Sequence, residues 1–409
     1  MKCRHCNTEL RLPLIDLGSA PPSNAYLTEQ TLHAPEKWFP LRVLVCESCW
    51  LVQTEDFAQA DELFDKEYAY FSSFSTSWLQ HAEKYMKDMT GRFSLNEGSH
   101  VVEVAANDGY LLQYFKECNI PCTGIEPTAS TAAAAREKGI SIVEEFFGVA
   151  LAQKLSSQGK RADLIVANNV LAHVPEINDF VSGFATLLKP NGVATFEFHH
   201  LLNLINENQF DTIYHEHFSY LSLTALETIF KENGLQIFYV EEYPTHGGSL
   251  RLFAQRPVTG IHAVTVRVAK LLKKEVEAGM NNSDFYKDFK YRVNTVKNNL
   301  LNFLIKAKQD GKKVAAYGAA AKGNTLLNYA GVGPDLIEYI IDKNPAKQGK
   351  YMPGSRIPIK DESHLNINPV DFILILPWNL KKEISEQIES TIRLKVKFLV
   401  AVPSLKLIN

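Results

Sequence analysis

The sequence lacks long apolar runs, an excess of one charge, internal repeats and low-complexity tracts. No apolar run approaches the ~20 residues that a membrane helix needs, and the first residues, Met1-Lys2-Cys3, show no apolar signal region. The 43 basic and 46 acidic side chains leave a formal net charge of −3. This balance gives nucleic acid or an anionic membrane no electrostatic attraction. We therefore expect a cytoplasmic protein with neither a nucleic-acid nor a membrane partner.

Cysteine is scarce, but its placement is informative. Of six cysteines in 409 residues, four form two CxxC pairs, Cys3-x-x-Cys6 and Cys46-x-x-Cys49. In a reducing compartment this spacing indicates a metal site rather than disulfides. Four thiolates are the ligand set of a structural Zn²⁺, which leaves no open position for catalysis. The alternatives are four unmetallated thiols, or His5 in place of one cysteine.

The order of expected elements predicts an α/β protein with three parts. Residues 1–60 contain the cysteine pairs and several turn signals, and predict a small zinc-binding module. Residues 61–256 begin with a helical pattern and then alternate strands and helices, which predicts a parallel sheet with an antiparallel edge. Residues 257–409 hold a helical stretch over 260–309 and then a second strand-turn-helix, which predicts a smaller Rossmann-like domain. Strands are expected at 101–104, 123–126, 163–167, 192–198, 235–241, 249–254, 313–317, 336–341, 370–376 and 396–401, and helices at 129–137 and 324–329.

The first strand of the central part leads into a candidate cofactor loop. Glu103 supplies an acidic residue, Ala105 stands at a small-residue position, and Gly109 is the one glycine of the turn. A dinucleotide would require a fuller glycine pattern to cradle its pyrophosphate, whereas a sulfonium cofactor has no phosphate. This loop therefore favours S-adenosylmethionine over a nicotinamide cofactor, with Asn107, Tyr110 and Leu111 as further cofactor contacts.

Three later strand ends complete this expected site. Glu126, before Pro127, follows the second strand, where a carboxylate can accept both ribose hydroxyls. Phe146 or Phe147 follows the third strand and is a candidate cover for the adenine, with a core role as the alternative. Asn168 and Asn169 end the fourth strand, where cofactor or substrate would pass. The alternative for the whole loop is an ordinary core strand with a polar end.

At this point the chain resembles the nucleotide-sugar C-methyltransferases of deoxysugar biosynthesis, over nearly its whole length. The resemblance rests on the paired CxxC module and on a series of segments, of which the most specific is Tyr214-His215-Glu216-His217. The others are 68–73, 103–112, 124–127, 168–173, the residues flanking that segment within 210–220, 245–251 and 317–325. It implies a class I methyltransferase fold and methyl transfer to C3 of a nucleotide-linked 4-keto-6-deoxyhexose through an enolate.

The chemistry of that reaction requires a base near neutral pKa and donors at the developing oxyanion. By resemblance, His217 removes the C3 proton and Glu216 holds an imidazole or a sugar hydroxyl. Tyr214 and Tyr68 contact the sugar or its keto oxygen, and His173 positions or stabilises the enolate. For each histidine the alternative is a structural hydrogen bond. Metal binding by 215–217 is a weak alternative because no outside ligand is evident.

Further substrate contacts are expected from the resemblance and from the C-terminal domain. Gly318–Asn324 follows a strand like a phosphate-binding loop, and Lys322 suits a diphosphate. The alternative is a small-residue turn that lets helix pack on strand. Three other functions stay open: oxygen or nitrogen methylation of a nucleotide sugar, a nicotinamide-dependent oxidoreductase, and a zinc-bearing binding module. The candidate substrate-binding residues are Phe64, Tyr70, His246, Arg251, Lys322 and Asn324.

Overall fold

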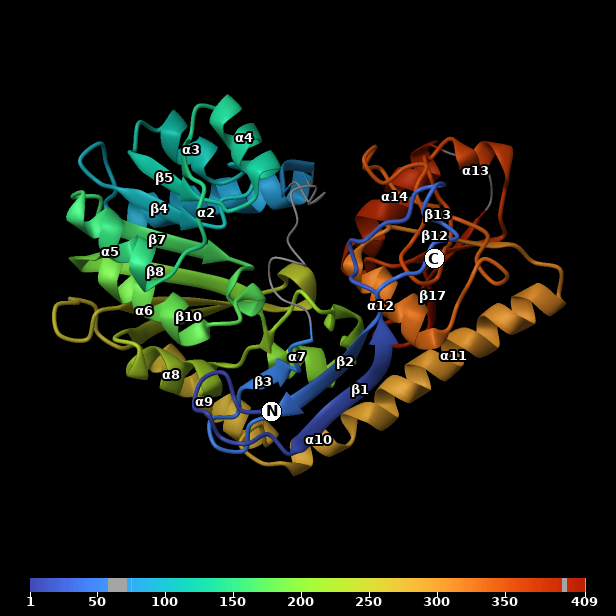
Figure 1. Ribbon diagram of the computed structural model, residues 1–409, viewed down its shortest axis with the longest axis horizontal. Coiled ribbons are helices and arrows are strands. Elements are labelled where there is room, and N and C mark those ends of the chain that lie inside the picture. Colours follow the sequence, from blue (N-terminus) through green and yellow to red (C-terminus); the bar gives the residue numbers. More distant parts are fainter. Residues whose placement is uncertain (58–71, 75, 392–395, 409) are drawn as a thin grey trace.

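The computed structural model describes residues 1–57, 72–74, 76–391 and 396–408. Two lobes lie side by side, the central sheet domain on the left and the C-terminal domain on the right (Figure 1). The N-terminal strands and a long helix connect the lobes along their lower edge. None of the helices in these ranges combines the length and the apolar character that crossing a bilayer requires.

The N-terminal part is an antiparallel sheet, which the sequence did not predict. Strands β1 (Leu12–Ala20), β2 (Phe39–Val45) and β3 (Val52–Thr54) follow one another, and the fourth strand is β9 (Ser219–Tyr220). In this register Val52 lies opposite Tyr220. The N-terminal sheet therefore includes the residues that directly follow His217.

The central sheet has seven strands in the order β10-β11-β8-β7-β4-β5-β6. From β4 the chain adds β5 and β6 on one side and then returns to add β7 and β8 on the other. A topological switch point therefore lies between β4 and β7. In such sheets ligands bind outside the carboxyl ends of the strands at this point. The strands are β4 (Val101–Val104), β5 (Cys122–Ile125), β6 (Ser141–Val143), β7 (Ala162–Asn168), β8 (Leu188–His199), β10 (Gln236–Tyr243) and β11 (Ser249–Gln255).

Helices cover the faces of this sheet because each buries one apolar stripe. In α6, the buried side chains Ile177, Phe180, Val181, Phe184 and Leu187 recur at helical spacing. β10 and β11 form the predicted antiparallel edge. The helices of this part are η1 (Ser72–Phe74), α2 (Thr76–Phe93), α3 (Leu112–Glu117), α4 (Ala129–Glu137), α5 (Val149–Ser157), η2 (Leu171–His173), α6 (Ile177–Leu187), α7 (Leu201–Asn206), η3 (Phe210–Thr212), α8 (Leu223–Glu232) and η4 (Thr245–Gly247).

The C-terminal part carries a second, mostly parallel sheet in the order β14-β13-β12-β15-β16-β17. The predicted helical stretch over 260–309 is divided, since α9 ends at Ala278. The next residue, Gly279, caps the helix with φ +93°. The elements are α9 (Val266–Ala278), α10 (Asp284–Lys287), α11 (Phe289–Gln309), β12 (Val314–Tyr317), α12 (Ala321–Ala330), β13 (Ile340–Ile341), β14 (Ile359–Lys360), α13 (His364–Ile367), β15 (Phe372–Ile375), η5 (Trp378–Leu380), α14 (Lys381–Thr391), β16 (Lys397–Val400) and β17 (Lys406–Ile408).

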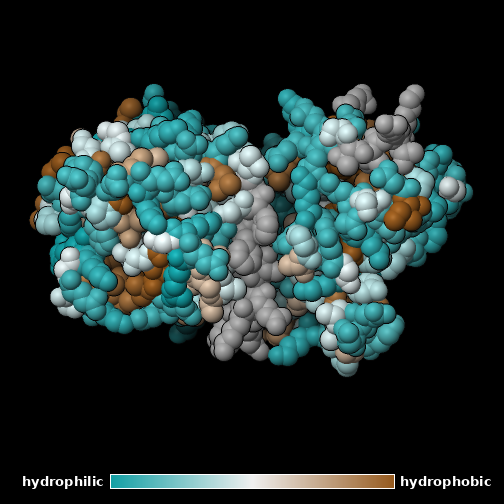
Figure 2. Space-filling view, turned by 90° about the horizontal axis from the view of Figure 1, so that it is seen from above, coloured by the Kyte–Doolittle hydropathy of each residue, from teal (hydrophilic) through white to brown (hydrophobic). Residues whose placement is uncertain are grey.

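One apolar core joins the N-terminal sheet to the C-terminal domain. Leu14 and Leu17 of β1 belong to the same buried cluster as Val296 and Leu300 of α11, and β1 contacts both α11 and α12. Helix α12 also packs on η3, just before the Tyr214–His217 segment. That segment therefore lies where all three parts meet. Seen from above, hydrophilic side chains dominate the outer surface of both lobes (Figure 2).

Candidate functional site

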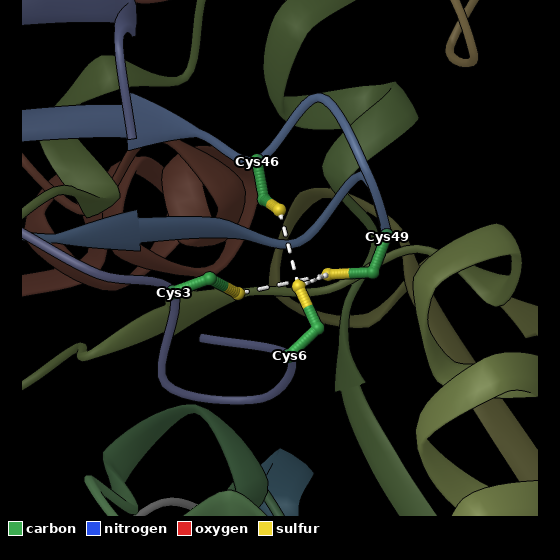
Figure 3. Close-up of side chains that lie close together, drawn as sticks. All are labelled: Cys3, Cys6, Cys46 and Cys49. Carbon is green, nitrogen blue, oxygen red and sulfur yellow. Dashed lines mark hydrogen bonds between the residues drawn. The ribbon is translucent and has the colours of Figure 1, made fainter. Parts of the chain in front are cut away.

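Four thiols converge in the N-terminal module, as Figure 3 shows. The Sγ atoms of Cys3 and Cys49 lie 3.6 Å apart, those of Cys6 and Cys46 3.5 Å, and those of Cys6 and Cys49 3.7 Å. A tetrahedron of thiolates around Zn²⁺, with Zn–S bonds of ~2.3 Å, has edges of ~3.8 Å. The cluster therefore fits zinc, as the CxxC spacing predicted. All four ligand atoms lie within 4.8 Å of one another.

The surroundings of the cluster support the thiolates and exclude His5 from the ligand set. The Gln53 side-chain amide donates to Cys3 Sγ at 3.2 Å. His5 turns its ring to Asn178, whose Oδ1 lies 2.7 Å from Nδ1. This bond ties His5 to the central domain, and among the described residues the candidate ligands are the four cysteines.

A cavity of about 550 Å³ opens at the carboxyl ends of β4, β5 and β7. Its position is the switch point of the sheet, and its volume lies within the ~300–1,000 Å³ typical of small-molecule sites. Most of the predicted cofactor residues line it. These are Ala105, Asn107, Tyr110, Glu126, Pro127, Phe146, Phe147, Asn168 and Asn169. Other residues that line the cavity include Ser72, Trp78, Thr128, His173, Val174, Pro175 and Glu176.

Glu126 is held rigidly at the wall of this cavity. The backbone N–H of Asn107 donates to its Oε2 at 2.9 Å, and that of Thr128 donates to its Oε1 at 2.9 Å. Each carboxylate oxygen keeps further lone pairs for a ligand. A fixed carboxylate at the end of β5 is what a ribose diol requires, so the residues present fit an adenosine-containing cofactor.

The loop after β4 has an unusual backbone. Ala105 and Asn107 have φ +56° and +49°, and Asn169 on the neighbouring loop has φ +56°. Non-glycine residues in this region are strained, and such strain gathers at ligand sites. Gly109, with φ +76°, does not line the cavity, and a Cβ there would lie 2.3 Å from Ile140 Cδ1. Its role is close packing of the loop against Ile140 and against Ala135 of α4.

Two other predicted cofactor residues lie outside the cavity wall, and the two predicted phenylalanines of that wall differ in their surroundings. Glu103 is buried in β4 and Leu111 is buried before α3, and neither lines the cavity. Burial raises the pKa of Glu103 well above its usual value, and Asp108 and Glu126 add to this increase. Phe146 is 62% exposed at the rim, whereas Phe147 packs against Phe180 and Phe184 in the core.

His217 lies in a hydrogen-bond network that defines its tautomer. Its Nδ1 is 2.8 Å from the Thr212 carbonyl oxygen, which can only accept, so Nδ1 carries the proton. Its Nε2 lies 2.8 Å from the Tyr214 hydroxyl and accepts a hydrogen bond from it. Burial lowers the pKa of His217 well below its usual value, and neighbouring His173 adds to the decrease. The ring is therefore neutral, with its basic nitrogen at Nε2, and its pKa lies below the near-neutral value expected of the base from the sequence.

His173 connects this network to the cofactor cavity. Its ring centroid is 4.6 Å from that of His217, and the two rings meet edge to face. His173 lines the cavity, and burial lowers its pKa to about 4. The structure thus brings two of the predicted catalytic histidines together beside the expected cofactor position.

Glu216 is paired with a residue that the sequence did not single out. The Asn24 side-chain amide donates to both Glu216 carboxylate oxygens, at 2.9 and 3.0 Å. Burial raises the pKa of Glu216 to about 7, although Asn24 and Lys347 oppose this increase. A turn-forming asparagine in the N-terminal module has no chemical signature of its own, so only the fold reveals this partner.

Lys322 lies in a second polar group, between the central and C-terminal domains. Its Nζ donates to Asn379 Oδ1 at 3.2 Å and lies 4.7 Å from the Trp378 ring centroid. The Trp378 indole donates to Asp211 Oδ2 at 2.7 Å. Burial lowers the pKa of His199 to about 3 and that of His246 to about 4, and Lys322 adds to both decreases.

Arg251 and Asn324 do not reach the cofactor cavity. Arg251 is 1% exposed, and its guanidinium donates to Glu197 Oε2 at 2.6 and 3.1 Å. Asn324 is also 1% exposed and accepts from Asn328 at 3.0 Å. His246 packs edge to face on Trp78 of the cavity wall, with ring centroids 5.1 Å apart. The predicted residues Phe64, Tyr68 and Tyr70 lie outside the described residues.

Comparison with known families gives matches over all three parts. Family models cover residues 3–64, "Putative zinc binding domain", residues 78–240, "Methyltransferase domain", and residues 244–403, "C-methyltransferase C-terminal domain". Two solved structures with low overall likeness are magnesium protoporphyrin IX methyltransferase from Synechocystis and PH0226 protein from Pyrococcus horikoshii. The first shares 18% identity over 44% of this chain and 83% of that chain, with TM-score 0.36. The second shares 15% identity over 49% of this chain and 100% of that chain, with TM-score 0.39.

Among curated relatives, C-methyltransferase NovU from Streptomyces niveus is 33% identical over 408 residues, 100% of this chain and 97% of the relative. A ubiquinone biosynthesis O-methyltransferase from Chelativorans is 28% identical over 101 residues, 24% of this chain and 39% of that protein. Only the first likeness extends over the zinc-binding, methyltransferase and C-terminal parts together. The chain therefore belongs to the family of C-methyltransferases that includes NovU, and it is an S-adenosylmethionine-dependent enzyme with a zinc-binding module.

Proposed function

We propose that the enzyme methylates C3 of a nucleotide-linked 4-keto-6-deoxyhexose, and that His217 removes the C3 proton. The observation that carries this proposal is the defined tautomer of His217, whose Nε2 is unprotonated and whose ring packs on His173 of the cofactor-cavity wall. Carbon is not nucleophilic until it loses a proton, so C-methylation requires a base at this place.

The residues have the following roles. His217 Nε2 takes the C3 proton, and the electron pair of the C–H bond forms the C3–C4 double bond while the C4 carbonyl becomes an enolate. The Tyr214 hydroxyl, now 2.8 Å from Nε2, would turn to donate to the sugar. When bound, S-adenosylmethionine would supply an electrophilic methyl group to C3, and the electrons of its S–CH₃ bond would go to sulfur. His217 then releases its proton to solvent.

Charge and hydrogen bonding support the anionic steps. Lys322 is a half-buried cation between the domains, and Asp211 raises its pKa against the decrease that burial causes. A positive charge there favours either the enolate or the substrate diphosphate. Glu216, fixed by Asn24, accepts a sugar hydroxyl. Glu126 and the loop after β4 hold the methyl donor.

Solvent isotope exchange tests this function directly. The enzyme is incubated in D₂O with dTDP- or GDP-linked 4-keto-6-deoxyhexoses, first without and then with S-adenosylmethionine, and C3 is followed by NMR. We expect deuterium at C3 without the methyl donor and a C3 methyl group with it. Methylation on oxygen or nitrogen without exchange would contradict the proposal, because those acceptors need no carbon acid.

A further inference from the structure

The two residues between the first pair of zinc ligands point away from the metal into the central domain. Arg4 and His5 are almost fully buried, with side chains 5% and 1% exposed. A zinc site that served only to fold the N-terminal module would not require buried polar side chains directed out of that module. The contacts of these two side chains therefore identify the part of the central domain that the module binds.

Both side chains bind one short segment, residues 174–178. Arg4 Nη1 donates to the Pro175 carbonyl oxygen at 3.2 Å. Three residues later, the Asn178 amide donates to the His5 carbonyl oxygen at 2.9 Å, and His5 Nδ1 donates to Asn178 Oδ1 at 2.7 Å. The segment is thus bound near both ends, and Val174, Pro175 and Glu176 between η2 and α6 line the cofactor cavity.

Arg4 also reaches the segment that carries His217. Its guanidinium lies 5.4 Å from the ring centroid of Phe218, and its Nη2 donates to the Thr54 carbonyl oxygen at 3.1 Å and to Asp56 Oδ1 at 2.8 Å. The Phe218 N–H donates in turn to the Ala172 carbonyl oxygen at 2.8 Å, next to His173. Arg4 therefore contacts both the 174–178 segment at the cavity and the segment that carries His217.

We propose that Arg4 is a positioning residue through which the zinc loop fixes the wall of the methyl-donor cavity, so that zinc binding supports cofactor affinity. This inference rests on the cavity at the ends of β4, β5 and β7 being the cofactor site. The planar guanidinium donates in several fixed directions at once, which a lysine cannot do. The requirement is therefore for the geometry of arginine and not only for its charge.

The test compares full-length variants by three measurements: the dissociation constant of S-adenosylhomocysteine by calorimetry, the zinc content, and the thermal midpoint. Arg4→Gln and Arg4→Lys remove the fork of donors, and Asn178→Ala removes the contact from the other side without altering the zinc loop. Arg11→Gln, at a side chain 77% exposed in the same module, is the matched control. Glu126→Ala tests the cavity itself.

We expect Arg4→Gln, Arg4→Lys and Asn178→Ala to weaken binding of S-adenosylhomocysteine about tenfold with zinc retained, and Arg11→Gln to bind as the wild type does. Wild-type affinity in Asn178→Ala and in either Arg4 variant would overturn the inference, while loss of binding in Glu126→Ala would still support the cofactor site. Wild-type affinity in Glu126→Ala would instead remove the cofactor site on which the inference rests.

Hydrogen exchange of the wild type keeps the inference testable if the Arg4 variants do not fold. We expect removal of zinc by a chelator to speed exchange in peptides covering 171–180 and to leave β11 unchanged. Unchanged exchange over 171–180 in the zinc-free enzyme would overturn the proposal.

Discussion

The Tyr214 hydroxyl donates to Nε2 of His217 over 2.8 Å. Because the opposite ring nitrogen is bound to the Thr212 carbonyl, this hydrogen bond marks Nε2 as the basic position. In the proposed mechanism, the Tyr214 hydroxyl must give up this hydrogen bond when Nε2 takes the substrate proton. The pair is therefore the centre of the predictions on catalysis.

Replacement of the base should separate chemistry from binding. We expect His217→Asn to lower the turnover number at least ~10²-fold, the lower range for loss of a general base, while the dissociation constant of S-adenosylhomocysteine stays near that of the wild type. Steady-state kinetics and calorimetry check this. His33→Asn, at an exposed position, serves as control. Wild-type turnover in His217→Asn would remove this residue from the mechanism.

Glu216 should give the reaction a pH dependence near neutrality. Its pKa is raised to about 7, so the carboxyl is protonated at pH 6 and ionised at pH 8. An ionised carboxylate accepts a sugar hydroxyl more strongly, and we expect kcat/KM to rise across this interval. Glu216→Gln cannot ionise and should flatten the rise. A wild-type profile that is flat from pH 6 to 8 contradicts this role.

The zinc ligands should determine metal content and stability together. We expect Cys3→Ser to lower both the zinc content and the thermal midpoint, since a hydroxyl does not replace a thiolate in a tetrahedral site. Cys118→Ser, at an exposed cysteine outside the cluster, is the matched control and should retain its zinc. Atomic emission and thermal unfolding provide the measurements. Full zinc content in Cys3→Ser would exclude the four-thiolate site.

The buried pair of Arg251 and Glu197 should stabilise the central domain in a pH-dependent way. Burial would raise the pKa of Glu197, but His81 and Arg251 lower it to about 2. A carboxylate with a lowered pKa in the folded state contributes stability above its unfolded pKa of ~4.3, and this contribution is lost as pH falls toward 2. Glu197→Gln removes the nearer counter-charge of a buried guanidinium and leaves only Glu241, at 3.9 Å, so we expect a loss of about 3–5 kcal/mol.

Urea unfolding at pH 7 and at low pH checks this prediction. Glu83→Gln, which breaks the exposed pair between Glu83 and Lys87, is the control and should change stability by less than ~1 kcal/mol. If Glu197→Gln and Glu83→Gln lower the free energy of unfolding equally, the Arg251 pair contributes no more stability than a surface pair.

Local patterns predicted the elements of the central domain well, because apolar periodicity and turn residues are properties of short segments. The strand at 101–104 and the helix at 129–137 have the predicted bounds, and most of the cofactor residues line one cavity. Arg251 shows the limit. The sequence suggested a substrate ligand, but only the strand register places Glu197 opposite it, where the two charges neutralise each other.

The contacts that sequence reasoning missed all join distant segments. Asn24 and Trp378 have no catalytic pattern around them, yet Asn24 binds Glu216 and Trp378 binds Asp211 because the three parts of the chain fold against one another. The fourth strand of the N-terminal sheet was missed for the same reason, since it comes from a segment far along the chain.

That fourth strand has a consequence for engineering. β3 pairs with β9, which follows His217 closely in the sequence. A chimera that exchanges only residues 1–57 between homologues would therefore pair β3 of one protein with β9 of the other. Modular exchange should therefore transfer 1–57 and 209–222 as one unit, although these stretches are far apart in the gene.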